Sequence, residues 1–474
     1  MKFIDAGGNA IGSTALGRQV LTAAANRPEL TAEISAIKNW RKEYLPVFRN
    51  VAKLELMSSQ SALDIATRGL AEFERSVITD DGRVLVDAVR DAWRNSKDAV
   101  AMVMVKGSGK LVEPKIDADK FVSQHLAEPG IATALKDFNL DSMNQNLLIA
   151  LAGGAEYSPA RTWLEWGGTV AIVARAREDL WLELISLARR SSGTLYVPVL
   201  KSRTNGVDVQ HLDDLQLAKV AGLDLVKDYE AIAGWLSMLA RTENRKLVLG
   251  SYAYAPGTKH IEVQAVQHSL ARVMTEALPK SRVVLTWLAT PTDSYAVPAE
   301  IVQDMNVRFA KRSFGTKIRD AMYMVKKHQP ELFKDESGRA LAVIDSTSSL
   351  QGPSYALAKR VQRWLAYQQV FADRNVAYLV SPPAKTQSVL GVRILRATFA
   401  GSPKFGLIPF EVKEAVDLSA ALLICVLNEP KRLSPMASYI DLAVHGGLWR
   451  LIYRPNDAWR ASTVRGLAGL FRKP

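Results

Sequence analysis

From residue 146 onward, short apolar runs alternate with segments that carry apolar residues at helical spacing. Each run has the length of a buried strand, and an intervening segment such as Arg177–Arg190 mixes apolar and charged positions. Strands that alternate with helices form parallel sheets, because each crossover helix covers one face of the sheet. We therefore predict an α/β fold with a doubly wound parallel sheet. Its first strands are Leu147–Ala152, Thr169–Ala174, Thr194–Leu200 and Lys246–Gly250.

Later apolar runs extend this sheet. The further strands expected are Val283–Ala289, Ala340–Ile344 and Val376–Val380, which gives a sheet of at least seven strands. We expect Leu147–Ala152 to be central and the last two of these strands to pair near it. An amphipathic helix is expected over Ile261–Leu278, and a long basic helix over Pro298–Lys327.

The composition is that of an ordinary globular protein. Of the 474 residues, 48% are hydrophobic and 23% are charged. The longest uninterrupted apolar run, Ala420–Leu427, is far shorter than the ~20 residues that span a bilayer. No apolar core follows Lys2, so we expect no secretory signal. The single cysteine, Cys425, allows no disulfide within the chain, and we expect a cytoplasmic protein.

The formal net charge of +13 favours anionic partners such as nucleotide phosphates or acidic lipid headgroups. No helix-turn-helix signature, zinc-finger spacing or RNA-binding aromatic motif is present, so nucleic acid is not an expected partner. The tail from Trp459 to Lys473 has apolar residues on one side and basic residues around it. Two interpretations of this tail stay open: peripheral contact with an acidic membrane, or a helix docked on the protein's own surface.

The candidate chemistry lies between the last two predicted strands. Tyr355 and Lys359 are four residues apart, so both side chains lie on one face of a helix. A phenol has an ordinary pKa of about 10, and a nearby ammonium favours the phenolate, so we expect Lys359 to lower the pKa of Tyr355. A serine hydroxyl at the preceding strand end can hydrogen-bond a carbonyl oxygen. Such groups can protonate an alkoxide as hydride arrives, or deprotonate an alcohol as hydride leaves.

The order of strand, serine cluster, Tyr-x-x-x-Lys helix, strand and Pro-Pro with a nearby threonine resembles the catalytic half of the short-chain dehydrogenase/reductase family. The resemblance covers roughly residues 146–390 and implies a Rossmann-like fold and an NADP-dependent oxidoreductase. It implies that Tyr355 donates or accepts the proton, and that Lys359 lowers the pKa of Tyr355 and holds the ribose hydroxyls. A serine would orient the carbonyl; the candidates are Ser348, Ser346 and Ser349.

The cofactor half departs from the family's pattern. Glu156 and Tyr157 occupy the first loop, where the dinucleotide fingerprint would continue with glycine. Arg175 follows the second strand, where a basic residue suits a 2′-phosphate, so we expect NADP(H) to be preferred over NAD(H); Arg177 is a second candidate. The residues expected to bind the cofactor, by position or by resemblance, are Gly153, Gly154, Ser158, Arg175, Gly250, Ser251, Pro382 and Thr386.

Histidines offer little further chemistry. Four residues close in sequence are candidates to line a site: Tyr254, Lys259, His260 and His268. His260 and His268 are eight residues apart, but two histidines without a third ligand do not make a metal site. His445 is either a second proton donor or a structural residue.

We expect three regions. Residues 1–141 form an N-terminal helical extension that mediates dimerisation or covers the cofactor site. Residues 142–390 form the Rossmann-like catalytic domain, and residues 391–474 cover the substrate. The apolar C-terminal segments favour a hydrophobic carbonyl or acyl substrate, and a homo-oligomer or a multi-enzyme partner is expected. The departures in the cofactor half leave a second hypothesis open: a degenerate relative that serves as a scaffold or nucleotide-sensing subunit.

Overall fold

A mostly parallel seven-stranded sheet forms the centre of the protein, for which we obtained a computed structural model. The structure describes residues 1–95, 98–136, 138–348, 351–428 and 440–470. The strand order is β13-β9-β8-β5-β6-β7-β4, and only β4 runs antiparallel to its neighbour. The strands are β4 (Val100–Lys106), β5 (Asn146–Leu151), β6 (Thr169–Val173), β7 (Thr194–Leu200), β8 (Lys246–Ser251), β9 (Val283–Ala289) and β13 (Val376–Val380).

The six parallel strands follow the order of a doubly wound sheet. If they are numbered along the chain from β5 to β13, their order from β7 across to β13 is 3-2-1-4-5-6, which is compatible with a Rossmann-like fold. The predicted strand Leu147–Ala152 corresponds to β5 and is central, as expected. Val376–Val380 corresponds to β13 but lies at the edge of the sheet, paired with β9 alone in this sheet.

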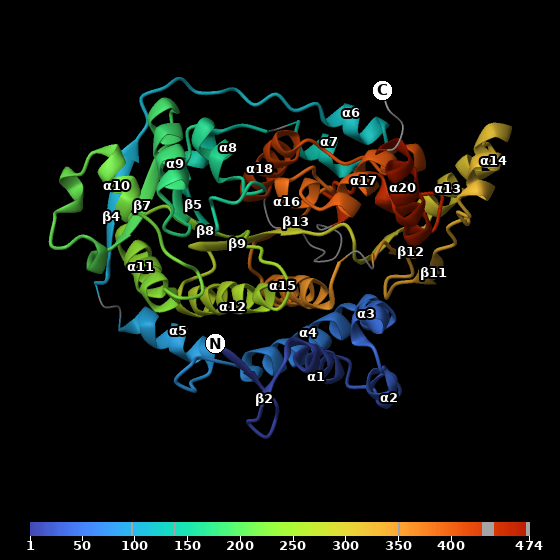
Figure 1. Ribbon diagram of the computed structural model, residues 1–474, viewed down its shortest axis with the longest axis horizontal. Coiled ribbons are helices and arrows are strands. Elements are labelled where there is room, and N and C mark those ends of the chain that lie inside the picture. Colours follow the sequence, from blue (N-terminus) through green and yellow to red (C-terminus); the bar gives the residue numbers. More distant parts are fainter. Residues whose placement is uncertain (96–97, 137, 349–350, 429–439, 471–474) are drawn as a thin grey trace.

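Helices cover both faces of this sheet (Figure 1). Leu147, Ile149 and Leu151 of β5 face one apolar core, whereas Leu148 and Ala150 face the other. Because both faces are covered, the strand reads as a continuous apolar run rather than an alternating one. The first core is shared with α11 (Tyr229–Thr242), α12 (Lys259–Ala277) and α15 (Pro353–Phe371), and the second with α8 (Ala160–Glu165), α9 (Glu178–Arg190) and α18 (Val412–Asn428).

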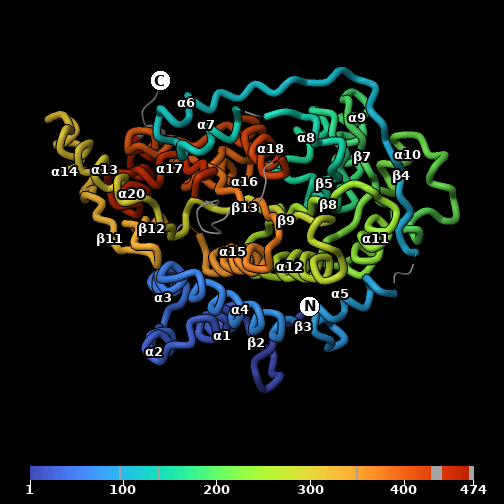
Figure 2. Tube along the Cα trace, turned by 180° about the vertical axis from the view of Figure 1, so that it is seen from behind, coloured from blue at the N-terminus to red at the C-terminus, as the bar shows by residue number. Residues whose placement is uncertain are grey.

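The N-terminal helices form a further layer over α12 and α15, as Figures 1 and 2 both show. Contact is close at Gly69, because a Cβ there would lie 2.3 Å from the ring of Trp364. The predicted helical extension over residues 1–141 is not entirely helical. It supplies β4 to the main sheet and forms a small sheet of β1 (Lys2–Ile4), β2 (Ala10–Ile11) and β3 (Val77–Ile78). Its helices are α1 (Ser13–Ala25), α2 (Pro28–Ala36), α3 (Trp40–Leu56), α4 (Ser59–Ser76) and α5 (Leu85–Arg94).

A separate unit is inserted between β9 and α15, and it corrects one prediction. Ala340–Ile344 does form a strand, but β12 belongs to a second, antiparallel sheet of order β10-β12-β11. Its apolar run was misleading because both of its faces are covered: Ala342 and Ile344 join the large core, and Leu341 and Val343 pack with Leu56. These strands are β10 (Ser294–Pro298), β11 (Glu331–Lys334) and β12 (Ala340–Asp345).

The same unit corrects the prediction of one long helix over Pro298–Lys327. The segment contains two helices, α13 (Glu300–Ala310) and α14 (Phe314–Met322). The break occurs because the Ser313 side chain accepts a hydrogen bond from the Thr316 amide and so starts a new helix.

The described part of the C-terminal region is mainly helical. Trp459, which is 5% exposed, faces inward from α20, and α20 packs along α17. This arrangement favours the docked-helix interpretation of the tail. The remaining elements are α6 (Ala118–Ser123), α7 (Gly130–Ala134), α10 (Asp214–Val220), α16 (Gln387–Leu390), α17 (Arg393–Gly401), α20 (Pro455–Leu470) and short 3-10 turns. Within the described part of the chain, no helix combines the length and apolar character needed to cross a membrane.

Candidate functional site

The carboxyl ends of the parallel strands bring four loops to one edge of the sheet. They follow β5, β8, β9 and β13, and they begin at Ala152, Tyr252, Thr290 and Ser381. The strand order reverses between β5 and β8, and ligands of open α/β sheets bind in the crevice at such a switch point. Most of the predicted site residues belong to this edge.

Tyr355 lies in the first turn of α15, within a cluster of rings. The His260 ring stacks on it at 5.4 Å between centroids with an interplanar angle of 11°. Tyr254 meets it edge to face at 6.1 Å. His260 comes from α12 and Tyr254 from the loop after β8, so these two of the candidate residues do line this cluster. His268 does not, because its Nε2 contacts Glu74 of α4 at 2.7 Å.

Lys359 lies one turn further along α15. Its ammonium is 5.6 Å from the centroid of the Tyr355 ring, and it donates hydrogen bonds to the Leu288 carbonyl at 2.9 Å and to Gln362 Oε1 at 3.2 Å. The predicted pair therefore does lie on one helix face. It meets the edge of the sheet beside β9.

Burial decides the protonation of this pair. Burial raises the pKa of Tyr355 to about 12, and a hydrogen bond with the Thr290 side chain offsets only part of the rise. Burial also lowers the pKa of Lys359 to about 8. The expectation that Lys359 would bring the pKa of Tyr355 below its ordinary value is therefore wrong, because loss of solvent disfavours the phenolate. At neutral pH the pair is a neutral phenol beside a mostly charged amine.

His260 is also neutral at physiological pH. It is 2% exposed, and burial next to Lys359 lowers its pKa to about 3. Its Nδ1 accepts a hydrogen bond from the Ala255 amide at 3.3 Å, which assigns the ring proton to Nε2. Within the described residues, that Nε2 has no hydrogen-bond partner. The cluster thus holds a buried N–H donor that no described residue of the chain uses.

The hydroxyl beside Tyr355 comes from an unexpected residue. Thr290 follows β9, whereas Ser346 and Ser348 follow β12 in the second sheet. The Ser346 amide donates to the Asp293 carbonyl at 3.2 Å, and the Ser348 carbonyl accepts from the Gln351 amide at 3.2 Å. Ser349 lies outside the described residues. Thr290 was detectable in principle, because it ends a strand that the sequence does predict.

The first loop is packed against protein. A Cβ on Gly153 would lie 2.8 Å from the Ile172 side chain, and a Cβ on Gly154 would lie 2.7 Å from Leu180. Both glycines are therefore required by packing, whatever else they do. The Ser158 hydroxyl accepts from the Ala160 amide at 3.3 Å at the start of α8.

This loop is also tied to the loop after β13. The Tyr157 hydroxyl donates to the Pro382 carbonyl at 2.7 Å, and the Glu156 carboxylate accepts from the Gln387 amide at 2.8 Å. These two bonds connect the ends of β5 and β13. We call them the β5–β13 latch. The sequence had flagged Glu156 and Tyr157 only as departures from a glycine pattern.

The other cofactor candidates have mixed surroundings. Arg175 is exposed just beyond β6, on the same edge of the sheet. Arg177 is paired with Asp179. Gly250 is fixed by packing, because a Cβ there would lie 2.2 Å from the Tyr252 ring, and its neighbour Ser251 is buried. Thr386 caps α16 by accepting from the Val389 amide at 3.4 Å.

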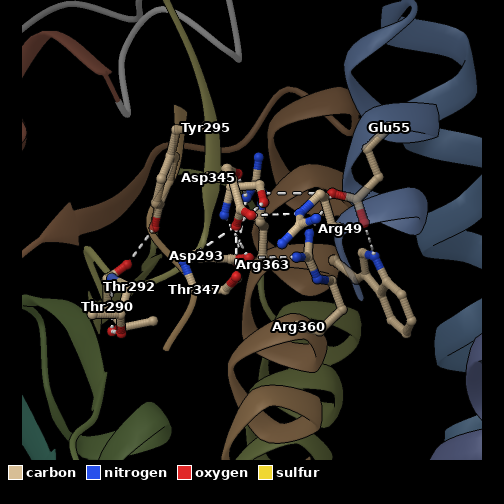
Figure 3. Close-up of polar contacts among 12 residues, drawn as sticks. Arg49, Glu55, Thr290, Thr292, Asp293, Tyr295, Asp345, Thr347, Arg360 and Arg363 are labelled. Carbon is tan, nitrogen blue, oxygen red and sulfur yellow. Dashed lines mark hydrogen bonds and ion pairs between the residues drawn. The ribbon is translucent and has the colours of Figure 1, made fainter. Parts of the chain in front are cut away.

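A cluster of buried charged residues connects α15 with a loop of this edge and with the N-terminal layer (Figure 3). Arg360 is 1% exposed and bonds Glu55 of α3 at 2.7 Å and Asp293 at 2.6 Å. Arg363 donates to Asp293 at 3.3 Å and to the Ser294 carbonyl at 2.7 Å. We call Glu55, Asp293, Arg360 and Arg363 the buried ion cluster. It joins the N-terminal layer, α15 and the loop that carries Thr290.

His445 lies in a segment that contacts the end of β13, but its ring nitrogens are held in structural contacts. It is fully buried, its Nε2 contacts Glu128 at 3.2 Å, and its Nδ1 accepts from the Gly447 amide at 3.1 Å. Within the described residues, no group of three potential ligands is arranged to hold a metal ion.

Comparison with known proteins adds no relative: no family model matches the chain, and neither a curated protein nor a solved structure matches it significantly.

Proposed function

We propose that this chain is an NADP-dependent oxidoreductase of the short-chain type, which reduces a carbonyl group of a hydrophobic substrate. The observation that carries the proposal is the position of the Tyr355–Lys359 pair. The pair lies on the helix between β9 and β13, the fifth and sixth parallel strands of a 3-2-1-4-5-6 sheet, at the edge where such sheets bind ligands. An order of strand, Tyr-x-x-x-Lys helix, strand and Pro-Pro supports the proposal, with β9 as the first strand in place of β12.

The residues present fit a dinucleotide at two places. Lys359 has an ammonium at the sheet edge that can hold ribose hydroxyls, and exposed Arg175 at the end of β6 can bind a 2′-phosphate. The fit at Gly153 and Gly154 is weaker, because packing alone accounts for both glycines. When bound, the cofactor would supply hydride.

The chain's own groups would supply the proton. Because the pKa of Tyr355 is raised to about 12, its phenol holds a proton throughout the neutral range and is suited to donate it. Thr290 would orient the substrate oxygen toward that phenol. The Lys359 ammonium would stabilise the phenolate left behind, since opposite charges favour each other strongly away from water.

A first experiment measures binding of NADP(H) and NAD(H) by fluorescence or thermal shift. We expect saturable binding with NADP(H) preferred, and we expect Arg175→Asp to weaken NADP(H) selectively. Binding of neither cofactor would refute the proposal. Equal loss of both cofactors in Arg175→Asp would remove the role of Arg175 in reading the 2′-phosphate.

A second experiment tests Tyr355 directly. Tyr355→Phe keeps the ring that stacks on His260 and removes only the transferable proton. Single-turnover reduction should fall by roughly 10²–10⁴, the usual scale of positioned acid catalysis. Tyr229→Phe, which removes a hydroxyl whose hydrogen bond is to Glu230 on α11, is the matched control and should leave the rate unchanged. A fully active Tyr355→Phe variant would end this mechanism.

The β5–β13 latch favours a second candidate function, a nucleotide-sensing or scaffold subunit without turnover. The latch joins the loops after β5 and β13, both of which lie at the edge where a cofactor would bind. For this candidate, cofactor binding is expected without hydride transfer, and Tyr157→Phe should raise the affinity by releasing the bond to Pro382. Turnover by the wild-type chain with any ketone would exclude it.

A further inference from the structure

Helix α14 presents an apolar face to solvent. Phe314, Ile318 and Met322 are four residues apart, so they lie on the same face, and they are 79%, 51% and 70% exposed. Met324 follows the helix and is 64% exposed. Scattered single apolar residues are normal at a surface, but a continuous apolar helix face marks an interaction site.

The opposite face of α14 is held firmly to the body of the protein. Asp320 is 3% exposed and accepts hydrogen bonds from Arg319 at 2.7 Å and from the Tyr453 hydroxyl at 3.0 Å. Arg312 forms a further ion pair with Asp320, and Arg319 also donates to the Lys404 carbonyl at 2.7 Å. Rotating the apolar face inward would break these buried ion pairs, which is costly. The outward direction of the apolar face is therefore fixed.

Basic residues surround this face. Residues 300–330 contain seven basic residues and three acidic ones, a formal charge of +4. Two of the three acids, Asp304 and Asp320, are already in ion pairs with arginines. Lys311, Lys317 and Lys326 are exposed on or beside α14. An apolar helix face flanked by lysines is complementary to a surface whose outer layer is anionic and whose interior is apolar.

The position of α14 favours a flat partner. Figures 1 and 2 both show it at an extremity of the molecule, projecting beyond α13 and α20. A projecting helix is convex, so it buries little area against a globular protein, whereas it can enter the headgroup region of a bilayer. We propose that α14 docks this protein on an anionic phospholipid membrane. Membrane contact through the C-terminal tail was one of two open interpretations. The proposal assigns such contact to a different helix, since Trp459 of α20 is buried against the body of the protein.

The test measures binding of the full chain to phosphatidylcholine vesicles with and without phosphatidylserine. We expect binding only with phosphatidylserine, and weaker binding at high salt because screening shortens the reach of the lysines. Lys317→Gln should weaken binding by about fivefold, which is the contribution of one basic residue to the affinity for an anionic surface. Phe314→Ser should weaken it by at least about tenfold, because a large buried apolar side chain is lost.

Matched methionines supply the control. Met322→Ser should weaken vesicle binding strongly, whereas Met57→Ser, at a residue of similar exposure (60%) beside α3, should leave it unchanged. For a second measurement, Met322→Cys and Val464→Cys are labelled with an environment-sensitive fluorophore; Cys425 is buried and does not compete. A blue shift at residue 322 alone supports the proposal.

Three results would overturn it. They are no binding to phosphatidylserine vesicles, equal loss in Met57→Ser and Met322→Ser, or a blue shift at residue 464 alone. Light scattering adds a fourth: a wild-type dimer that Met322→Ser dissociates would assign the face to a second copy of the chain instead of a membrane.

Discussion

Replacement of Glu55 by Gln tests the buried ion cluster most directly. Glu55 is fully buried, and its carboxylate accepts hydrogen bonds from Arg360 at 2.7 Å and from the Trp364 indole at 2.8 Å. Gln keeps the size of the side chain but removes its charge. Arg360 would then remain buried with Asp293 as its counter-ion, and Asp293 is already shared with Arg363.

The expected cost follows from that uncompensated charge. Removing one partner of a buried ion pair costs about 3–5 kcal/mol of unfolding free energy. Urea unfolding, followed by circular dichroism, should therefore show a lower midpoint for Glu55→Gln. The matched control is Glu331→Gln, because Glu331 pairs with Lys53 of the same helix α3 at an exposed site. An exposed pair contributes about 0–1 kcal/mol of unfolding free energy, so this control should change the urea midpoint very little.

A double-mutant cycle then separates the pair from its neighbours. The double variant Glu55→Gln/Arg360→Met should lose less unfolding free energy than the sum of the two single variants, because each single change leaves the other residue's charge buried without its partner. A Glu55→Gln variant within 1 kcal/mol of the wild type would refute the reasoning. Strict additivity would show that Glu55 and Arg360 do not interact as the structure describes.

Two further predictions concern pH. His260→Phe keeps a ring stacked on Tyr355 and should shift acid unfolding, followed by circular dichroism, to lower pH. In the wild type the folded pKa of about 3 lies below the ordinary 6.5, so the unfolded chain binds a proton that the folded chain does not, and stability falls as the pH falls from 6.5 to 3. The variant lacks this group and should not lose that stability. No shift would show that His260 is not buried and neutral. For Lys359, the folded pKa of about 8 lies below 10.5, so stability should rise with pH between these values, and Lys359→Met should abolish that rise in urea titrations at several pH values. If Lys359 also stabilises the phenolate, reduction by the wild type should decline above about pH 8; a rate that stays flat there would remove this role.

Local pattern was enough to find most of the elements. β5, β6, β7, β8, β9 and β13 each correspond to an apolar run of strand length, and α9 and α12 correspond to segments with apolar residues at helical spacing. Tyr355 and Lys359 were found for the same reason, since four residues along a helix always return to one face. These predictions depend on residues that are close in sequence.

Tertiary structure decided which elements meet. The run Ala340–Ile344 has the composition of a central strand, and only its pairing with β10 and β11 places it in a second sheet. Thr290 became the neighbour of Tyr355 for a similar reason, because the insertion moved the serine-bearing strand β12 out of the main sheet. Sequence pattern reports that a residue is buried, but not what buries it.

The protonation of the site was likewise beyond the sequence. Spacing alone suggested that Lys359 would lower the pKa of Tyr355, whereas partial burial of the phenol among segments distant in sequence raises it. The buried ion cluster joins residues 55, 293, 360 and 363, and no local pattern relates the first two to the last two. Charge burial depends on the whole surrounding shell of atoms, and that shell exists only once distant segments have packed together.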